Sequence, residues 1–180
     1  MTAGPLRLFV AAYPPPQIAA QLVAQLSAMQ LRGLKVSLPD QVHLTLQFIG
    51  DTDPRQLDDV QESIRRAASG LPPANIAVLG LISLPERGRA RLVAAELEPH
   101  PTLLELHRRL ALRLATNTKE RSRDRFLPHM TLGRYTSAGD RVEHALPDQP
   151  RFDINEVSLM QSLLRPDRAE HRVLATFPLR

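Results

Sequence analysis

The sequence contains no cysteine and no tryptophan, and its aromatic residues amount to 5 Phe and 2 Tyr. Without cysteine the chain cannot form a disulfide framework, a cysteine nucleophile or a thiolate metal site. This composition suits a reducing compartment, so we expect a cytoplasmic protein. The scarcity of aromatic side chains also argues against broad recognition of single strands by stacking, which needs several such rings.

Long apolar runs are missing as well. The longest run near the N-terminus covers residues 8–13 and ends at Pro14-Pro15-Pro16, far short of the roughly 18 residues that a membrane span needs. We therefore expect neither a transmembrane helix nor a signal peptide. With 180 residues, of which 43% are hydrophobic and 23% charged, the chain can bury a core without metals or disulfides. We expect one domain over residues 1–180 and a monomer.

The net charge is +4, and 21 of the 23 cationic residues are arginine. Arginine favours an anionic partner because its guanidinium group matches the geometry of phosphate. An alternative is a genome rich in arginine codons, which would give the same composition without any ligand.

The pattern of apolar residues and turn residues predicts both strands and helices. The expected helices cover residues 17–30, 53–68 and 102–116, and the expected strands cover residues 6–13, 35–37, 42–49, 76–84, 91–98, 126–133, 152–164 and 171–179. This order indicates an α+β fold with antiparallel pairing rather than regular β-α-β alternation. Neither glycine-rich nucleotide-binding fingerprint is present.

A short motif occurs twice, nearly half the chain apart. His43-Leu44-Thr45-Leu46 returns as His129-Met130-Thr131-Leu132, and chance is a poor explanation for a repeat with the same fixed positions. In a strand, residues two apart point to the same side. Each copy therefore presents His and Thr together and directs its apolar residues into a core.

Two such pairs that face each other would form a phosphate site. One imidazole can remove a proton from attacking water while the other protonates the departing oxygen, and the two hydroxyl groups can hold phosphoryl oxygens. This chemistry requires no metal. A zinc site is the other interpretation of two histidines, but no H-x-x-x-H pattern or nearby third ligand accompanies either copy. A serine hydrolase is unsupported because the G-x-S-x-G motif is missing.

The paired motifs resemble those of the two-histidine phosphoesterase superfamily, specifically the LigT-like RNA 2',3'-cyclic phosphodiesterases, also described as 2'-5' RNA ligases. The resemblance extends over nearly the whole chain. It includes the segments 7–14, 43–50, 126–134, 158–164 and 173–179. It implies a single two-lobed domain, with two antiparallel sheets related by a pseudo-twofold axis around a central cleft and with helices outside.

The resemblance also implies an activity. A terminal 2',3'-cyclic phosphate of RNA would open to a 2'-phosphate, with His43 as general acid toward the 3'-oxygen and His129 as general base toward water. Thr45 and Thr131 would bind substrate, and no metal or cofactor is expected. By microscopic reversibility, the same residues could join a 2'-phosphate-type end to a 5'-hydroxyl group, which would be 2'-5' ligation. The alternatives are a phosphodiesterase for small cyclic nucleotide derivatives or 2'-5' oligonucleotides, and a nucleotide-binding or RNA-binding module without turnover.

Two further residues are candidates for substrate binding. Arg134 has the wrong strand parity relative to His129, but a β-bulge at Gly133 would swing it inward. Gln47 has the same parity as His43 and Thr45, so it is expected to line the cleft, unless it faces solvent at the rim. His171 stands where the family favours an aromatic residue such as tyrosine.

The remaining charged groups are harder to place from the sequence. We expect His100, His107 and His144 to be surface residues. The basic run Lys119, Arg121, Arg123 and Arg125 precedes the second motif and could steer an RNA backbone, with a solvated loop as its alternative. Arg87, Arg89 and Arg91, which flank a turn, have the same two interpretations.

Overall fold

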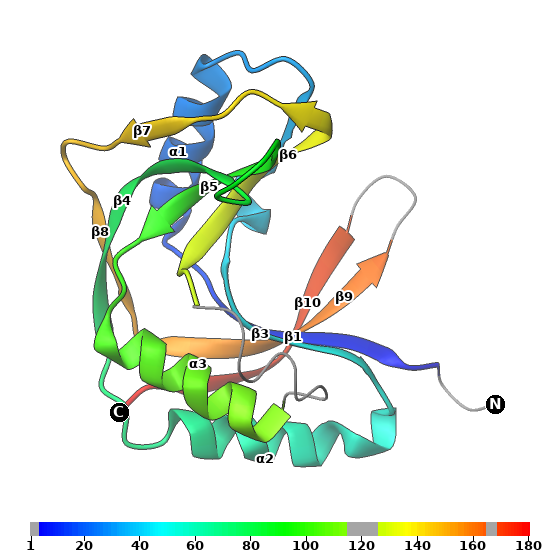
Figure 1. Cartoon of the computed structure of the whole chain (residues 1–180). Helices are drawn as coiled ribbons and strands as arrows, with labels where there is room; N and C mark the ends of the chain where they lie inside the picture. Colours follow the sequence, from blue (N-terminus) through cyan, green and yellow to red (C-terminus); the bar gives the residue numbers. More distant parts are fainter. Residues whose placement is uncertain (1–3, 115–125, 165–168) are drawn as a thin grey trace.

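The structure is a computed structural model that describes residues 4–114, 126–164 and 169–180 (Figure 1). The helices are α1 (Pro16–Ala28), α2 (Leu57–Ala68) and α3 (Pro101–Leu114), with 3-10 turns at Pro39–Gln41 and Pro54–Gln56. The strands are β1 (Leu6–Ala12), β2 (Leu34–Val36), β3 (Leu44–Thr52), β4 (Ala74–Leu84), β5 (Ala90–Leu97), β6 (His129–Gly139), β7 (Glu143–Ala145), β8 (Arg151–Ile154), β9 (Glu156–Leu164) and β10 (Ala169–Pro178).

The expected α+β class with antiparallel pairing is confirmed, with two differences in the strands. The segment 152–164, expected as one strand, forms β8 and β9, which are interrupted at Asn155. They separate because β8 pairs with β4 whereas β9 pairs with β1. In addition, β6 continues to Gly139, six residues beyond its expected end, and pairs there with β5. The basic run 119–125 lies outside the described residues.

Each helix buries one stripe of small or branched apolar side chains. Helix α1 begins after the three prolines, with Pro16 in its first turn, where the missing N–H costs nothing. It buries Ala19, Leu22 and Leu26. Before α2, the Asp53 carboxylate accepts a hydrogen bond from the Arg55 backbone N–H (2.9 Å), which caps the 3-10 turn that leads into the helix. Helix α3 buries leucines at the spacing of one helical face, Leu103, Leu106, Leu110 and Leu114.

The strands form one sheet in the order β10-β9-β1-β3-β6-β5-β4-β7, with β2 added on β6 and β8 on β4. Its two halves, β10-β9-β1-β3 and β6-β5-β4-β7, meet at a single residue pair, Leu44 of β3 and Met130 of β6. The two sheets expected from the sequence are therefore joined through the middle residues of the repeated motifs.

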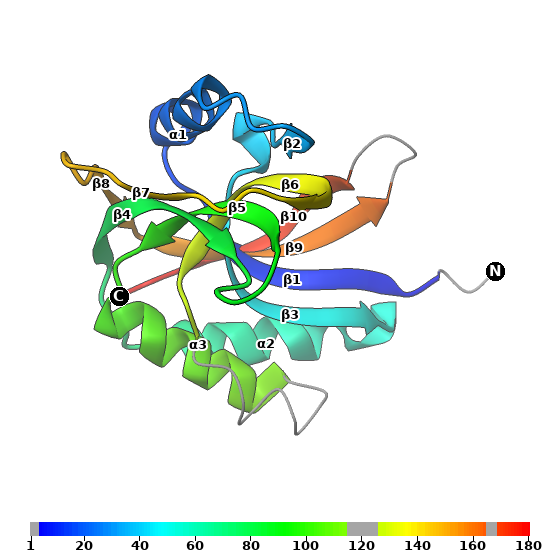
Figure 2. The ribbon, with the colours of Figure 1, turned by 45° about the horizontal axis from the view of Figure 1, so that its top comes forward.

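The helices lie on the outer faces of these two halves (Figures 1 and 2). Helices α2 and α3 pack together, with α3 against β3 and α2 against β10, while α1 packs against β2 and β6. Within the described part of the chain, no helix has the length and apolar character that a membrane crossing requires. The opposite faces of the half-sheets, which the helices leave uncovered, are the ones that receive the polar residues of the motifs.

Candidate functional site

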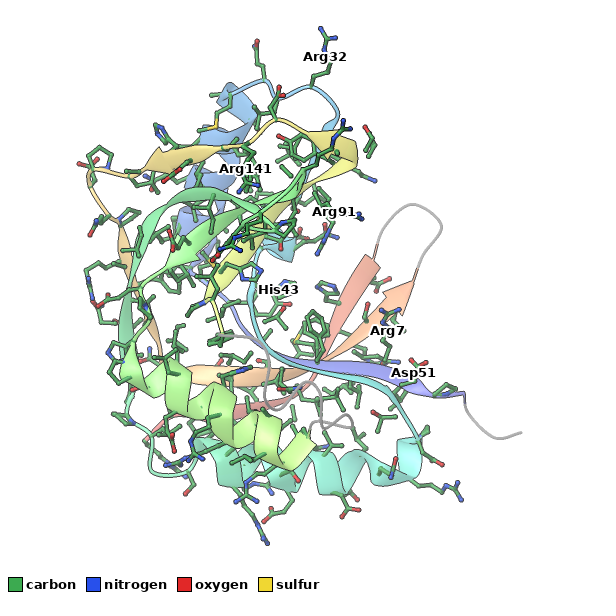
Figure 3. The ribbon with its side chains drawn as sticks, viewed as in Figure 1. Arg7, Arg32, His43, Asp51, Arg91 and Arg141 are labelled. Carbon is green, nitrogen blue, oxygen red and sulfur yellow. The ribbon has the colours of Figure 1, made fainter. Side chains whose placement is uncertain are left out.

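The pairing of Leu44 with Met130 sets the arrangement of the two motifs. Extending this antiparallel register by one residue in each direction places His43 opposite Thr131 and Thr45 opposite His129. Directly opposed residues share a face of the sheet. Leu44 (1% exposed) and Met130 (0% exposed) point into the core, so all four polar side chains lie on the other side, which we call the motif face. In Figure 3, His43 lies between the two half-sheets.

Both motif histidines are oriented by the same hydrogen bond. Nδ1 of His43 lies 2.7 Å from the carbonyl oxygen of Gln41, and Nδ1 of His129 lies 2.8 Å from that of Leu127. A carbonyl oxygen can only accept, so each Nδ1 carries a proton and donates it. The neutral ring then has its lone pair on Nε2, which leaves that nitrogen available to exchange a proton with a ligand.

A β-bulge follows each threonine. In β3, Thr45 pairs with Ala11 and Gln47 with the adjacent Val10, so Leu46 is an extra residue. In β6, Thr131 pairs with Ala94 and Gly133 with the adjacent Val93, so Leu132 is extra. Leu46 and Leu132 occupy the same position of the repeat. A bulge reverses the alternation of faces beyond it, and both motif strands have the same order of burial from Leu44 or Met130 through the next four residues.

This reversal corrects the expected position of Gln47. The residue lies on the core side of β3 beside Val10, is only 8% exposed, and donates its side-chain N–H to the carbonyl oxygen of Phe48 (2.8 Å). Phe48 takes the place on the motif face, opposite Phe9, and is 70% exposed. The parity count that placed Gln47 beside Thr45 is wrong because it did not include the extra residue.

The bulge in β6 has the corresponding effect on Arg134. Arg134 pairs with Leu92, two residues from the partner of Thr131, so its side chain lies on the motif face with Thr131. The expected bulge is thus present, but its extra residue is Leu132 rather than Gly133, and Gly133 does not have a positive φ. A larger residue at this position would be crowded, since an added Cβ would lie 3.1 Å from the carbonyl oxygen of Lys35 in β2.

His43 stands among aromatic rings. Its ring centroid lies 5.3 Å from that of Phe9, 5.4 Å from that of Tyr13 and 5.0 Å from that of His171. Burial lowers the pKa of His43 to about 4, against the opposing effect of the Gln41 hydrogen bond, and the positive charges of His171, Arg134 and His129 lower it further. In the free protein, His43 is therefore neutral at pH 7.

Two polar atoms beside His43, the Tyr13 hydroxyl and Nδ1 of His171, are buried and have no hydrogen-bond partner in the described part of the chain. Burial, together with the charge of Asp40, raises the pKa of Tyr13 to about 12. Burial also lowers the pKa of His171. His171 thus lies at the motif site, in ring contact with His43 and Phe9. Phe9 and Tyr13 were not among the expected site residues. Both belong to the expected strand 6–13, and their separation by four residues, an even number, could have indicated that they share a face.

The other histidines differ from one another. His107 is half-buried, which corrects its expected surface position. It bonds to the carbonyl oxygen of Leu46 (2.6 Å) and stacks on Phe126. His100 accepts a hydrogen bond from the backbone N–H of Thr102 at the start of α3, and His144 is exposed on β7. Among the residues that the structure describes, no three His, Asp or Glu side chains are grouped as a metal would require.

Comparison with known proteins places this site in a family context. Residues 14–165 match the family model of the 2'-5' RNA ligase superfamily. A Thermus thermophilus protein named RNA 2',3'-cyclic phosphodiesterase is 30% identical, over 97% of this chain and 91% of that protein. One from Methanothermobacter thermautotrophicus with the same name is 27% identical, over 71% and 73%.

Solved structures have the same fold. A crystal structure of a Thermus thermophilus protein has a TM-score of 0.82 at 29% identity, over 97% of this chain and 98% of that one. Escherichia coli LigT complexed with 3'-AMP has a TM-score of 0.80 at 21% identity, with the same coverage. The family model, the relatives and the fold agree over nearly the whole chain, and the chain therefore belongs to the 2'-5' RNA ligase superfamily.

Proposed function

We propose that this protein is a phosphoric diester hydrolase that opens the terminal 2',3'-cyclic phosphate of RNA to a 2'-phosphate, with neither a metal nor a cofactor. The observation that carries the proposal is the pairing of the two motifs, in which each imidazole is fixed through Nδ1 and its Nε2 has no hydrogen-bond partner among the residues that the structure describes. Two such groups beside two hydroxyl groups meet the needs of acid–base catalysis at one phosphorus. The names of the curated relatives support the same activity.

In the proposed reaction, Nε2 of His129 takes a proton from water as the water oxygen attacks phosphorus. The bond between phosphorus and the 3'-oxygen breaks, and His43 gives a proton to that oxygen. The products are a 2'-phosphate and a 3'-hydroxyl group. The hydroxyl groups of Thr45 and Thr131 and the guanidinium group of Arg134 bind the other phosphoryl oxygens. A 5'-hydroxyl group that attacks phosphorus in place of water would give a 2'-5' phosphodiester and a 3'-hydroxyl group by the same proton transfers, which is 2'-5' ligation.

Features beside the motifs support an RNA end as the substrate. Phe48 presents an exposed ring on the motif face, which gives a nucleobase an apolar surface. Arg7 of β1 lies two residues from Phe9, and therefore on the same face, and Arg91 belongs to β5 of the other half-sheet. Both arginines are exposed and lie on the open side of the molecule beyond His43 (Figure 3). Their charge suits the phosphates of a nucleotide chain.

An oligonucleotide that ends in a 2',3'-cyclic phosphate tests this function directly. We expect the wild-type protein to produce only 2'-phosphate ends with free 3'-hydroxyl groups, at the same rate in excess EDTA. Phosphorus NMR of the product identifies which oxygen keeps the phosphate. A 3'-phosphate product would contradict the proposal, as would activity lost in EDTA and restored by zinc. Competition by 2',3'-cyclic mononucleotides separates an RNA end from a small nucleotide as the preferred substrate.

The low pKa of His43 gives a second expectation. A general acid must be protonated, whereas the pKa of about 4 leaves His43 neutral near pH 7. A bound phosphate anion favours the charged imidazolium, so we expect 2'-AMP to raise the pKa of His43, as measured by NMR titration of its ring. Arg134→Gln should raise this pKa in the free protein because it removes a positive charge. The same variant should lower kcat/KM about 10-fold by loss of a phosphate contact.

Exposed Arg172 offers a matched control for Arg134, because the charge of Arg172 is not among the influences on the pKa of His43. Arg172→Gln should leave this pKa and the turnover unchanged. A His43 pKa that does not respond to 2'-AMP would show that the anion binds elsewhere, and would count against the acid role of His43.

A further inference from the structure

The two bulges leave equivalent backbone carbonyl groups that are satisfied in different ways. The carbonyl oxygen of Leu132, after the second motif, accepts a hydrogen bond from the backbone N–H of Ser37 at the end of β2 (2.8 Å). The carbonyl oxygen of Leu46, after the first motif, accepts from Nδ1 of His107 in α3 (2.6 Å). In one half-sheet a helix side chain donates the hydrogen bond to the carbonyl oxygen of the bulge, and in the other half-sheet the backbone at the end of β2 donates it.

The same imidazole also contacts the segment that leads into the second motif. Its ring stacks on Phe126 with the centroids 4.0 Å apart and the planes 8° from parallel. Phe126 precedes Leu127, whose carbonyl oxygen accepts the hydrogen bond from Nδ1 of His129. His107 therefore contacts the residue after Thr45 and the segment that orients His129.

The position of this imidazole is fixed by the packing of helix α3. The neighbouring leucines Leu103, Leu106 and Leu110 are fully buried. Because the carbonyl oxygen of Leu46 can only accept, Nδ1 of His107 carries a proton whether the ring is neutral or charged.

We propose that His107 is a positioning residue of the active site, which fixes the bulge after Thr45 and the approach to His129 with one side chain. The proposal rests on the proposed function. Without the donor, the buried carbonyl group of Leu46 loses its partner and the bulge is free to shift. Catalysis is sensitive to such changes, since a displacement of about 1 Å can cost on the order of 100-fold.

Two substitutions separate the hydrogen bond from the stacking. His107→Phe keeps a ring against Phe126 and removes the donor. His107→Asn places an amide nitrogen where Nδ1 lies and removes most of the ring. We expect His107→Phe to lower kcat about 10-fold with little change in KM, and to keep both limbs of the pH–rate profile. His107→Asn should keep kcat within about 3-fold of wild type while losing more thermal stability. Exposed His144→Phe is the matched control and should change neither.

Wild-type kcat in His107→Phe would overturn the proposal. Equal losses of kcat in the two variants would also overturn it, because packing alone would then explain them. Loss of one limb of the pH profile would show instead that His107 itself exchanges a proton with substrate.

Backbone amide NMR provides a readout that needs no turnover. We expect His107→Phe to change the amide chemical shifts of both Thr45 and His129. Changes confined to β3 would contradict the proposal that His107 connects the two motifs. If the wild-type protein is inactive but His107→Phe shifts both amides, the proposed reaction is contradicted and the structural link through His107 is retained.

Discussion

His129→Ala and His43→Ala should each lower kcat on a cyclic-phosphate oligonucleotide by about 100- to 10,000-fold, the usual contribution of a positioned acid or base. Each substitution removes the Nε2 atom that faces the motif side and also the Nδ1 hydrogen bond to Leu127 or Gln41. The fold should be retained, since both rings are only half-buried and lie on the motif face. Single-turnover rates at saturating substrate measure the effect on chemistry.

Asparagine substitutions separate the two nitrogens of each ring. In His129→Asn and His43→Asn, the amide nitrogen can still donate to the carbonyl oxygen that held Nδ1, but nothing replaces Nε2. We expect these variants to be as impaired as the alanine variants. Near-normal rates in the asparagine variants would mean that the rings act only by holding backbone, and would contradict acid–base catalysis.

The double variant His43→Ala/His129→Ala tests whether the two rings act as one unit. Groups that transfer protons in the same step show losses that do not multiply, so we expect the double variant to be about as slow as the slower single variant. Losses that multiply would indicate two independent sites. His144→Ala, on the exposed strand β7, is the control for removal of an unrelated histidine.

The two motifs could be predicted from the sequence, but the residues that surround His43 could not. Strand alternation places His and Thr of each motif on one face. This can be predicted because alternation and the motif itself involve only neighbouring residues. Phe9, Tyr13 and His171 meet His43 only because β1 lies between β9 and β3 in the sheet. That order depends on contacts between distant segments, which no local pattern encodes.

The bulges show a second limit of the sequence. Each adds one residue to a strand, which changes the face of the residues that follow it, in β3 as far as the next register shift. A bulge at Gly133 could be anticipated because glycine marks such irregularities, and it moves Arg134 to the motif face. The bulge at Leu46 has no such marker, so Gln47 was assigned to the wrong face. His107 was likewise unremarkable in sequence, since its role depends on the carbonyl group that this bulge frees.

Thr45→Val and Thr131→Val should each lower kcat by about 100- to 1,000-fold, the effect of removing one donor to a developing charge. Valine has nearly the shape of threonine without its hydroxyl group, so packing is changed little. Both threonines are half-buried on the motif face, and neither hydroxyl group has a hydrogen-bond partner among the described residues. We therefore expect the two hydroxyl groups to serve ligand binding rather than the fold.

Serine provides the rescue, because Thr45→Ser and Thr131→Ser keep the hydroxyl group and lose only a methyl group. We expect the serine variants to stay within about 10-fold of wild type. The pseudo-twofold arrangement predicts similar losses for the two valine variants, since each threonine lies opposite the histidine of the other motif. If only one valine variant is slow, a single phosphoryl oxygen is held and the symmetric description of the site is wrong. If both valine variants keep normal kcat and affinity for 2'-AMP, the hydroxyl groups do not bind phosphate.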